Sequence, residues 1–229
     1  MIEVKDIHKR YRRRDVLSGV SFTAEKGEIT CLIGVNGAGK STILKAIMGL
    51  TPISAGSILI DGLSLAPSLY EKIVFVPDHL TMPLSMKLSE AIRFMEDFYD
   101  SWNPKRASEL MQFFNLNHSD KIGNLSKGTA AKFSLMLGLG QDADYILMDE
   151  PFSGIDLFSR ESIMDVFTSD LIEGRGVLLT THEIGEMEQL IDKAVLLQNG
   201  KISKAFYCEE MRSEQGKSVI DVMREVYRG

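Results

Sequence analysis

Short apolar blocks, each bounded by polar or glycine-containing segments, recur along most of the chain. They are rich in Val, Ile and Leu, which is typical of strands buried on both faces of a parallel sheet. The blocks are 29–33, 73–76, 145–148, 177–180 and 194–197. Between the first two, apolar residues take helical spacing from Ser41 to Leu50. Strands that alternate with helices predict an α/β fold with a parallel-rich sheet.

The first part of the chain has a different pattern. Apolar side chains alternate with polar ones at Ile2 and Val4, and apolar residues return at Val16, Val20 and Phe22 before a polar turn. Alternation with a period of two predicts strands with one buried face, which pair antiparallel when short turns join them. We therefore expect an N-terminal antiparallel β element beside the main sheet.

Two later segments complete the expected organisation. From about 84 to 140 the pattern is helical and rich in large apolar side chains, which predicts a helical insert in the α/β core. After Asn199-Gly200, a dipeptide typical of hairpin turns, we expect a short strand and then a helix from about Val219 to Tyr227. The prediction is one domain over 1–229 with a helical subdomain at about 84–140.

Composition and charge exclude several classes of protein. A net charge of -6 argues against a protein that mainly neutralises a nucleic-acid backbone, although 9–14 is a basic run. Cys31 and Cys208 belong to no Cys/His array, so we expect neither a disulfide framework nor a zinc site, and a reducing cytoplasm fits best. No apolar stretch approaches the roughly 20 residues that span a bilayer.

A glycine-rich loop follows the first buried block. The run 34–41, Gly-Val-Asn-Gly-Ala-Gly-Lys-Ser, fits the phosphate-loop pattern between a strand and a helix. Its glycines let backbone N–H groups face phosphate oxygens, Lys40 reaches the β- and γ-phosphates, and the Ser41 hydroxyl binds Mg²⁺. The residues expected to bind ATP here are Gly34, Asn36, Gly37, Ala38, Gly39, Lys40, Ser41 and Thr42.

Two carboxylates end a later buried block. Asp149 and Glu150 directly follow 145–148, so the strand would deliver both to one edge of the sheet. Taken alone, an apolar run followed by Asp-Glu more often marks only the end of a strand. With a phosphate loop upstream, Asp149 is expected to hold the water shell of Mg²⁺ and Glu150 to act as the general base that polarises the attacking water.

With these motifs in this order, the chain resembles the ATP-binding-cassette family over nearly its whole length. The run 125–129, Leu-Ser-Lys-Gly-Thr, stands where that family has its signature, ideally Leu-Ser-Gly-Gly-Gln. The run 150–156 is similar to the family's D-loop, and 180–182, Thr-Thr-His, ends a strand like its switch histidine. The resemblance implies a P-loop NTPase core, with the signature carried on the helical insert.

The resemblance also implies roles for particular residues. Two cassettes would pack head to tail, so that Ser126 and Gly128 of one face the γ-phosphate held by Lys40 of the other. His182 would contact the γ-phosphate and help hold the general base, although a lone histidine at a strand end is usually structural. Tyr11 would stack on adenine, its alternative being a merely exposed side chain.

The chain departs from the family pattern in two motifs. After Val76-Pro77 the family has a glutamine that senses magnesium and contacts the transporter, and here Asp78 takes its place. Asp78 can bind Mg²⁺ through water, but it adds negative charge near the phosphates. In the signature, Lys127 replaces a glycine and Thr129 replaces the glutamine. These departures leave ATP binding as expected and put the rate of turnover in question.

The leading hypothesis is the ATPase subunit of a membrane transporter, with ATP and Mg²⁺ as cofactors. Its partners would be an integral permease and a second cassette, identical or a close paralogue, at the cytoplasmic face of the cell membrane. Together with 98–102, Phe-Tyr-Asp-Ser-Trp, the motifs are similar to small bacterial exporter cassettes of the antibiotic-resistance and acetoin-utilisation type. Met82, Met86 and Met95 would form a docking groove for the permease or, as helical methionines more often do, part of the core.

Two alternatives stay open at this point. One is a soluble cassette acting on a macromolecule, in iron–sulfur assembly, translation or DNA maintenance, which 12–14, Arg-Arg-Arg, beside Tyr11 would favour. The acidic balance and the single cassette argue against it. The other is a cassette that has lost catalysis, but Lys40, Asp149, Glu150 and His182 are all present. Neither cargo nor direction of transport follows from these residues.

Overall fold

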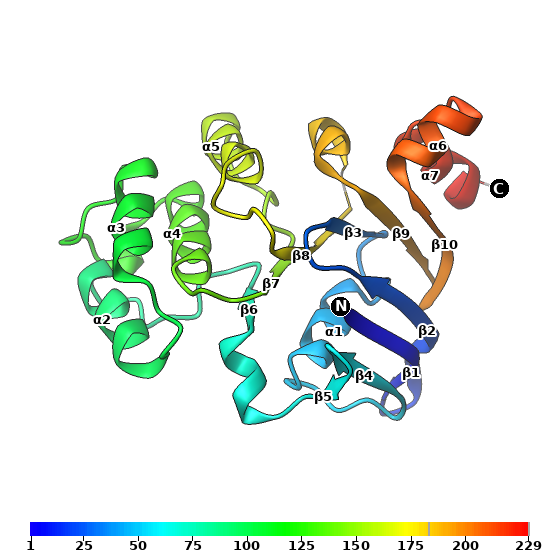
Figure 1. Ribbon diagram of the computed structural model, residues 1–229, viewed down its shortest axis with the longest axis horizontal. Helices are drawn as coiled ribbons and strands as arrows, with labels where there is room; N and C mark the ends of the chain where they lie inside the picture. The colour runs from blue at the N-terminus through cyan, green and yellow to red at the C-terminus, as the bar shows by residue number, and fades with distance from the viewer. Residues whose placement is uncertain (183, 229) are drawn as a thin grey trace.

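The larger of two sheets organises the computed structural model, which describes residues 1–182 and 184–228 (Figure 1). Its strand order is β10-β9-β3-β8-β7-β6, with parallel pairing from β9 to β6 and an antiparallel β10 at one edge. The strands are β3 Ile29–Ile33, β6 Ile73–Val76, β7 Tyr145–Asp149, β8 Gly176–Thr181, β9 Lys193–Gln198 and β10 Lys201–Tyr207. The expected parallel-rich α/β sheet is confirmed.

The second sheet is antiparallel and has the order β2-β1-β4-β5. The strands are β1 Ile2–Tyr11, β2 Arg14–Ala24, β4 Ala55–Ile60 and β5 Leu63–Ser64. Ile2 pairs with Ala24 on one side and Ile60 on the other. Arg12, with a left-handed φ of 52°, turns the hairpin between β1 and β2. The end of the basic run therefore lies exposed at a hairpin tip, as a solvated surface.

Alternation along the central strand divides the interior into two cores. In β3, Cys31 and Ile33 face one apolar cluster, which includes residues of α4, α5 and the C-terminal helices. Leu32 faces the other cluster, formed with the antiparallel sheet and α1 Lys40–Ile47. Successive side chains of a strand point to opposite faces, so a fully apolar strand can bind both layers to one sheet.

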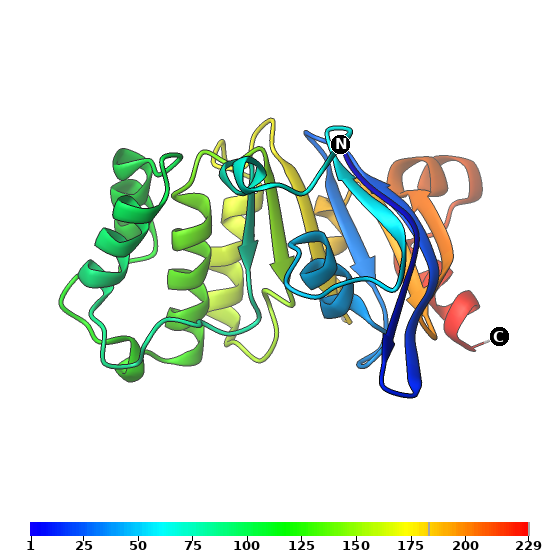
Figure 2. The same cartoon turned by 90° about the horizontal axis from the view of Figure 1, so that it is seen from below.

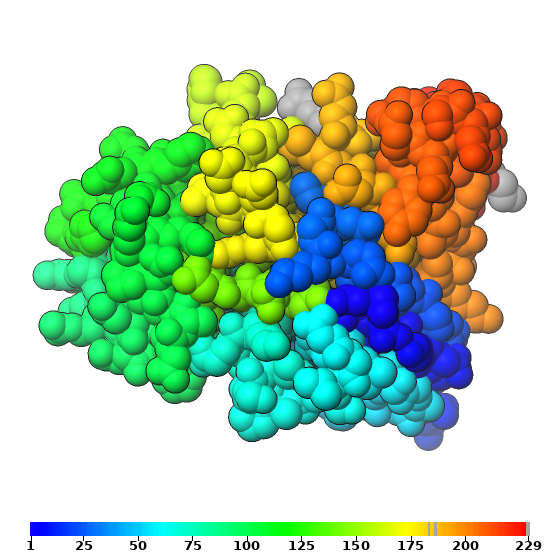
Figure 3. All heavy atoms as spheres, viewed as in Figure 1, coloured from blue at the N-terminus to red at the C-terminus, as the bar shows by residue number. Residues whose placement is uncertain are grey.

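The helices are unevenly distributed around the sheets. Figures 1 and 2 show α2, α3 and α4 at one end of the molecule and α6 and α7 at the other, with the strands between them; the space-filling view in Figure 3 shows the same order. The remaining helical elements are α2 Leu88–Phe98, α3 Pro104–Phe113, α4 Lys127–Leu139, α5 Leu157–Phe167, α6 Cys208–Gln215, α7 Val219–Arg228 and the short 3₁₀ segments η1 Pro67–Glu71, η2 Ile122–Asn124 and η3 Gly185–Leu190.

Two features of the described residues concern membrane spanning and cysteine reactivity. None of the described helices is both long and apolar enough to cross a lipid bilayer. Cys31 and Cys208 are buried and free. Burial raises the pKa of both thiols, that of Cys208 to about 11, so both stay protonated and unreactive near neutral pH.

Candidate nucleotide-binding site

The glycine-rich loop joins β3 to α1 at the carboxyl edge of the parallel strands. Gly37 and Gly39 have left-handed φ values of 80° and 113°, which residues with a side chain rarely adopt. A Cβ at Gly34 would lie 2.6 Å from the carbonyl oxygen of Leu197, and one at Gly39 would lie 2.7 Å from Leu17. The loop follows this path because its glycines allow close backbone contact with the neighbouring strands.

Lys40 begins α1 and points into the loop. Its ammonium donates to the carbonyl oxygen of Gly34 at 2.7 Å and forms an ion pair with Oε1 of Glu150 at 2.9 Å. The side chain is only 5% exposed, so both partners hold it away from bulk water. A buried cation is thus positioned at the N-terminus of α1, which itself carries a partial positive charge.

A hydrogen-bonded chain connects the helix to two strands. The Ser41 hydroxyl donates to Oδ1 of Asp149 at 3.0 Å, and the Thr180 hydroxyl donates to the same oxygen at 2.7 Å. The backbone N–H of Glu150 in turn donates to the Thr180 oxygen at 3.0 Å. Asp149 and Thr180 are register partners on β7 and β8, so strand pairing itself brings these groups together.

Glu150 is held from both sides. While Oε1 contacts Lys40, Oε2 lies 2.8 Å from Nδ1 of His182. The backbone of Glu150 has a φ of 48°, in the left-handed region that residues with side chains rarely adopt. Such strained residues gather at functional sites, where the surroundings over-determine them. The carboxylate is therefore fixed at the end of β7, between a lysine and a histidine.

A cavity of about 540 Å³ opens over these groups, and it brings together residues from six segments. Among the predicted site residues, it is lined by Asn36, Gly37, Gly39, Lys40, Ser41, Thr42, Asp78, Glu150 and His182. Four further lining residues, Val16, His79, Ser153 and Lys127, were not predicted as site residues. His79 and Ser153 adjoin predicted motifs, but Val16 is a strand residue with no sequence signal for this position.

The donor set at this site fits Mg²⁺. Ser41 and Asp149 offer hydroxyl and carboxylate oxygens, the hard ligands that Mg²⁺ prefers, and they already lie within hydrogen-bond distance of each other. Within the described residues no cluster of three or more His, Cys, Asp or Glu side chains is arranged as a metal site. Mg²⁺ bound with phosphates needs only one or two protein ligands and keeps several waters, so this agrees with the donor set.

Asp78 lies at the rim of the same cavity. Its Oδ1 atom is 2.6 Å from Nδ1 of His79, and both side chains are largely exposed. A half-exposed carboxylate near the phosphate loop has room for a water shell between itself and a metal ion.

Tyr11 lies outside the lining of this cavity. Its hydroxyl is 3.2 Å from the Thr51 hydroxyl, and Lys9 Nζ lies 4.5 Å from the centre of its ring. The ring is 47% exposed at the end of β1. One face of the Tyr11 ring is therefore available for stacking, while the Lys9 ammonium occupies the other face.

The predicted signature forms the beginning of α4, where Lys127 lines the cavity but Ser126 and Gly128 are not among its described lining residues. Ser126 caps the helix, because its hydroxyl accepts a hydrogen bond from the Thr129 N–H at 3.1 Å. A Cβ at Gly128 would collide with the Ser159 hydroxyl and lie 2.6 Å from Oδ2 of Asp156. Packing within this chain thus explains why position 128 needs a glycine.

Gly128 packs against the cap of the next helix, α5. Asp156 accepts hydrogen bonds there from the N–H and hydroxyl of Ser159, at 2.9 and 2.7 Å. These bonds favour the ionised carboxyl and lower the pKa of Asp156. The run compared with the D-loop therefore ends in a helix cap that fixes it against the signature.

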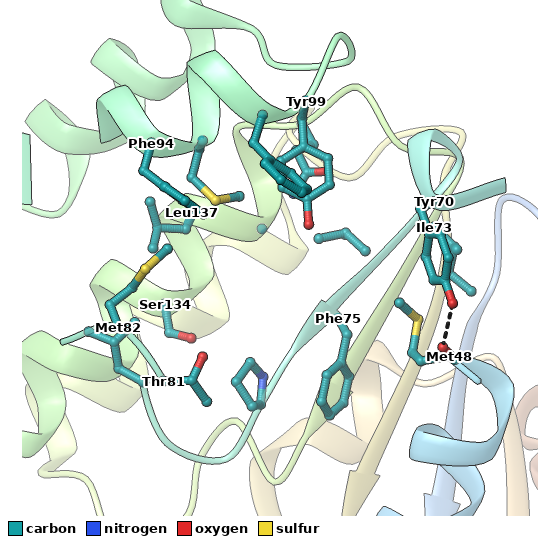
Figure 4. A pocket seen from close by; sticks show the side chains of 17 residues that line it. Met48, Tyr70, Ile73, Phe75, Thr81, Met82, Phe94, Tyr99, Ser134 and Leu137 are labelled. Atoms are coloured by element: carbon teal, nitrogen blue, oxygen red, sulfur yellow. Dashed lines mark hydrogen bonds between the residues drawn. The ribbon is translucent and has the colours of Figure 1, made fainter. Parts of the chain in front are cut away.

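A second, mainly apolar cavity of about 360 Å³ lies between β6 and the helical insert (Figure 4). Met82 and Met95 line it together with Phe94, Phe98 and Tyr99. The rings of Phe94 and Phe98 stack with centroids 5.6 Å apart. Met86, the third methionine of the predicted groove, is not among its lining residues and packs against the core.

Comparison with known proteins identifies the family. Residues 17–153 match the family described as ABC transporter. The chain belongs to the ABC transporter family. The cassette is 31% identical to the lipopolysaccharide export system ATP-binding protein LptB of Haemophilus influenzae, over 96% of each chain. It is 30% identical to the linearmycin resistance ATP-binding protein LnrL of Bacillus subtilis, over 88% of this chain and 68% of the relative.

Solved structures agree with the cassette fold. The ATP-binding subunit of an ABC transporter superimposes with a TM-score of 0.89 at 28% identity, over 99% of each chain. The protein is therefore an ATP-binding ABC cassette and an ATPase of the transporter-subunit type. The resemblance to antibiotic-resistance cassettes also agrees with the relative named for linearmycin resistance.

Proposed function

We propose that this cassette drives an integral membrane permease by closing head to tail with a second cassette on ATP and reopening after hydrolysis. The observation that carries the proposal is the arrangement of polar groups. Lys40, Ser41, Glu150 and His182 line one cavity, with Asp149 hydrogen-bonded to Ser41 beside it, whereas Ser126 and Gly128 are not among its described lining residues. A site with all its catalytic groups on one side of the nucleotide has room for a second surface on the other.

In this proposal each polar group has a definite task. Lys40 and the loop N–H groups hold the β- and γ-phosphates, and Ser41 with Asp149 would hold Mg²⁺, with Asp78 acting through a water. When bound, Mg²⁺ supplies positive charge that offsets the phosphate oxygens. Glu150 orients and polarises the attacking water, and His182 holds Glu150 in place through the 2.8 Å contact.

The Lys40–Glu150 ion pair connects binding to catalysis. Oε1 of Glu150 lies 2.9 Å from the Lys40 ammonium, so the ion pair occupies that oxygen. Phosphates compete for the same ammonium with more negative charge. When they take Lys40, Glu150 keeps its contact with His182 and gains a free oxygen for water. The base would thus become active only when nucleotide fills the loop.

An integral permease is the membrane partner expected for this cassette. The chain acts as one ATP-binding domain over 1–229, with the helical insert at about 84–140 as a subdomain. The cavity lined by Met82, Met95 and the neighbouring aromatic rings would receive an apolar segment of the permease, at the cytoplasmic face of the membrane. Several relatives are named for export or resistance, which supports export as the direction.

A catalytically blocked variant tests the head-to-tail arrangement. Glu150→Gln keeps the size of the side chain and removes the base, so we expect hydrolysis to fall by roughly 10² or more. ATP should then trap a dimer of twice the monomer mass in light scattering. The control is Glu150→Gln combined with Lys40→Ala, which should stay monomeric because the phosphates are no longer held.

A monomeric Glu150→Gln protein that nevertheless binds ATP would contradict this arrangement. The permease is tested separately, by purifying the tagged cassette from membranes. A stable integral protein in the complex supports the proposal. RNA, DNA or a protein scaffold without membrane spans in its place would contradict it.

A further inference from the structure

Lys127, in the signature, extends toward the cavity of its own chain. It is the first residue of α4, directly after the cap Ser126. A Cβ at Gly154 would collide with Lys127 Nζ, so the ammonium lies against the backbone at that glycine. Gly154 has a left-handed φ of 65° and leaves room for the long side chain. The side chain thus leaves the helix and crosses the run 150–156.

Lys127 is one of the residues that line the nucleotide cavity. Lys127 shares the 540 Å³ cavity with Gly37, Lys40, Glu150 and Ser153. It also lines an adjoining cavity of about 120 Å³ that contains Glu150 and Ser153. Glu150 and Ser153 lie beyond the phosphate loop, on the side where the general base stands. The ammonium therefore approaches the end of the site expected to hold the terminal phosphate.

Charge within the cavity favours a role for this cation. Lys40 is engaged by Gly34 and Glu150, whereas within residues 1–182 and 184–228 Lys127 forms no ion pair. Asp78 lines both cavities as well, and brings a negative charge to the same space. Asp78 and Lys127 are the two departures from the family pattern that change charge. They therefore bring charges of opposite sign to one cavity.

We propose that Lys127 binds the γ-phosphate of the nucleotide held by its own chain and offsets the charge of Asp78. The inference rests on the proposed nucleotide site and adds an intrasubunit contact to it. Ser126 and Gly128 in the same run would serve the nucleotide of the second cassette. One short segment would then sense two nucleotides, one through its backbone and cap and the other through a lysine.

Binding to the monomer separates this role from dimerisation. The full-length chain is titrated with Mg²⁺-ATP and with Mg²⁺-ADP at concentrations where light scattering reports monomer. Lys127→Met keeps the apolar stem and removes the charge. We expect its Kd for ATP to rise roughly three- to tenfold and its Kd for ADP to change less than twofold, because only ATP has the γ-phosphate.

Three further variants sharpen the assignment. Lys127→Arg should retain ATP affinity. Lys132→Met makes the same charge change further along α4, outside the lining of the cavity formed by the described residues, and should leave both Kd values unchanged. Asp78→Asn combined with Lys127→Met should bind ATP more tightly than Lys127→Met alone, because the carboxylate left uncompensated by the single change is then also neutral.

Equal changes for ATP and ADP, or no change for either, would overturn the proposal. A melting curve identifies a misfolded Lys127→Met protein, and Lys127→Gln then replaces it under the same expectations. A defect seen only in ATP-trapped dimers would also overturn it, since the lysine would then act on the other chain's nucleotide. Failure of Glu150→Gln to dimerise would contradict the head-to-tail arrangement and leave the monomer binding result unaffected.

Discussion

The phosphate loop and the start of α4 differ in how far this chain satisfies their polar groups. At the loop, Lys40 contacts Glu150 and Ser41 contacts Asp149, in a network that connects α1 to two strands, β7 and β8. At α4, the Ser126 hydroxyl contacts only Thr129 within its own turn among the described residues. Long-range hydrogen bonds therefore organise the first region, and local capping organises the second.

This difference separates the region that binds the nucleotide, the phosphate loop, from the region that responds to it, the start of α4. The loop side holds buried charges at fixed positions and can bind phosphates without another chain. The exposed end of α4 offers N–H groups and a partial positive charge, which are too weak alone to bind a nucleotide tightly. At position 128, packing against Ser159 already explains the lack of a side chain, so the glycine alone does not indicate contact with a second nucleotide.

The largest expected effect comes from removing the buried cation. Lys40→Ala should weaken ATP binding by roughly 100-fold or more, because the β- and γ-phosphates lose the lysine of the loop. His182→Ala should bind ATP normally and turn over roughly tenfold or more slowly, because Glu150 loses one of its two supports. Nucleotide titration and steady-state rates measure the two effects. Equal loss of binding in both variants would show that His182 is structural.

A smaller effect is expected where α4 meets α5. Gly128→Ala places a methyl against Ser159 and Asp156, so overpacking should destabilise the fold by roughly 1–3 kcal/mol. Thermal unfolding measures this. Ser159→Ala in the same chain removes the colliding hydroxyl and should restore part of the loss. An unchanged melting temperature for Gly128→Ala would show that packing does not determine the glycine, leaving its role to the second cassette.

The smallest effect concerns Asp78 at the rim of the cavity. If its carboxylate holds a magnesium-bound water, Asp78→Asn should shift half-activation of hydrolysis to roughly two- to fivefold higher Mg²⁺. Metal-free nucleotide binding should stay the same or tighten slightly, since a negative charge near the phosphates is gone. ATPase rates against free Mg²⁺, with a melting curve for each protein, measure this. Coincident magnesium curves with lower stability for the variant would show a structural aspartate.

Much of this protein was predictable because the relevant interactions are local. The strand, glycine loop and helix over 29–50 follow from apolar blocks and from glycines that permit unusual backbone angles. Asp149 and Glu150 end a block too apolar to be anything but a buried strand, so their place at the sheet edge follows from strand geometry. The order of these motifs along the chain then identified the family.

Contacts between distant segments were decided only by the tertiary structure. The Tyr227 hydroxyl near the end of α7 donates to the carbonyl oxygens of Ile33 and Leu197, at 3.0 and 3.3 Å, just before the phosphate loop. Likewise, no local sequence pattern predicts that the Lys127 side chain lies over Gly154. Periodicity tells which face of an element is buried, whereas side-chain partners depend on how whole elements pack, and that packing joins residues more than a hundred positions apart.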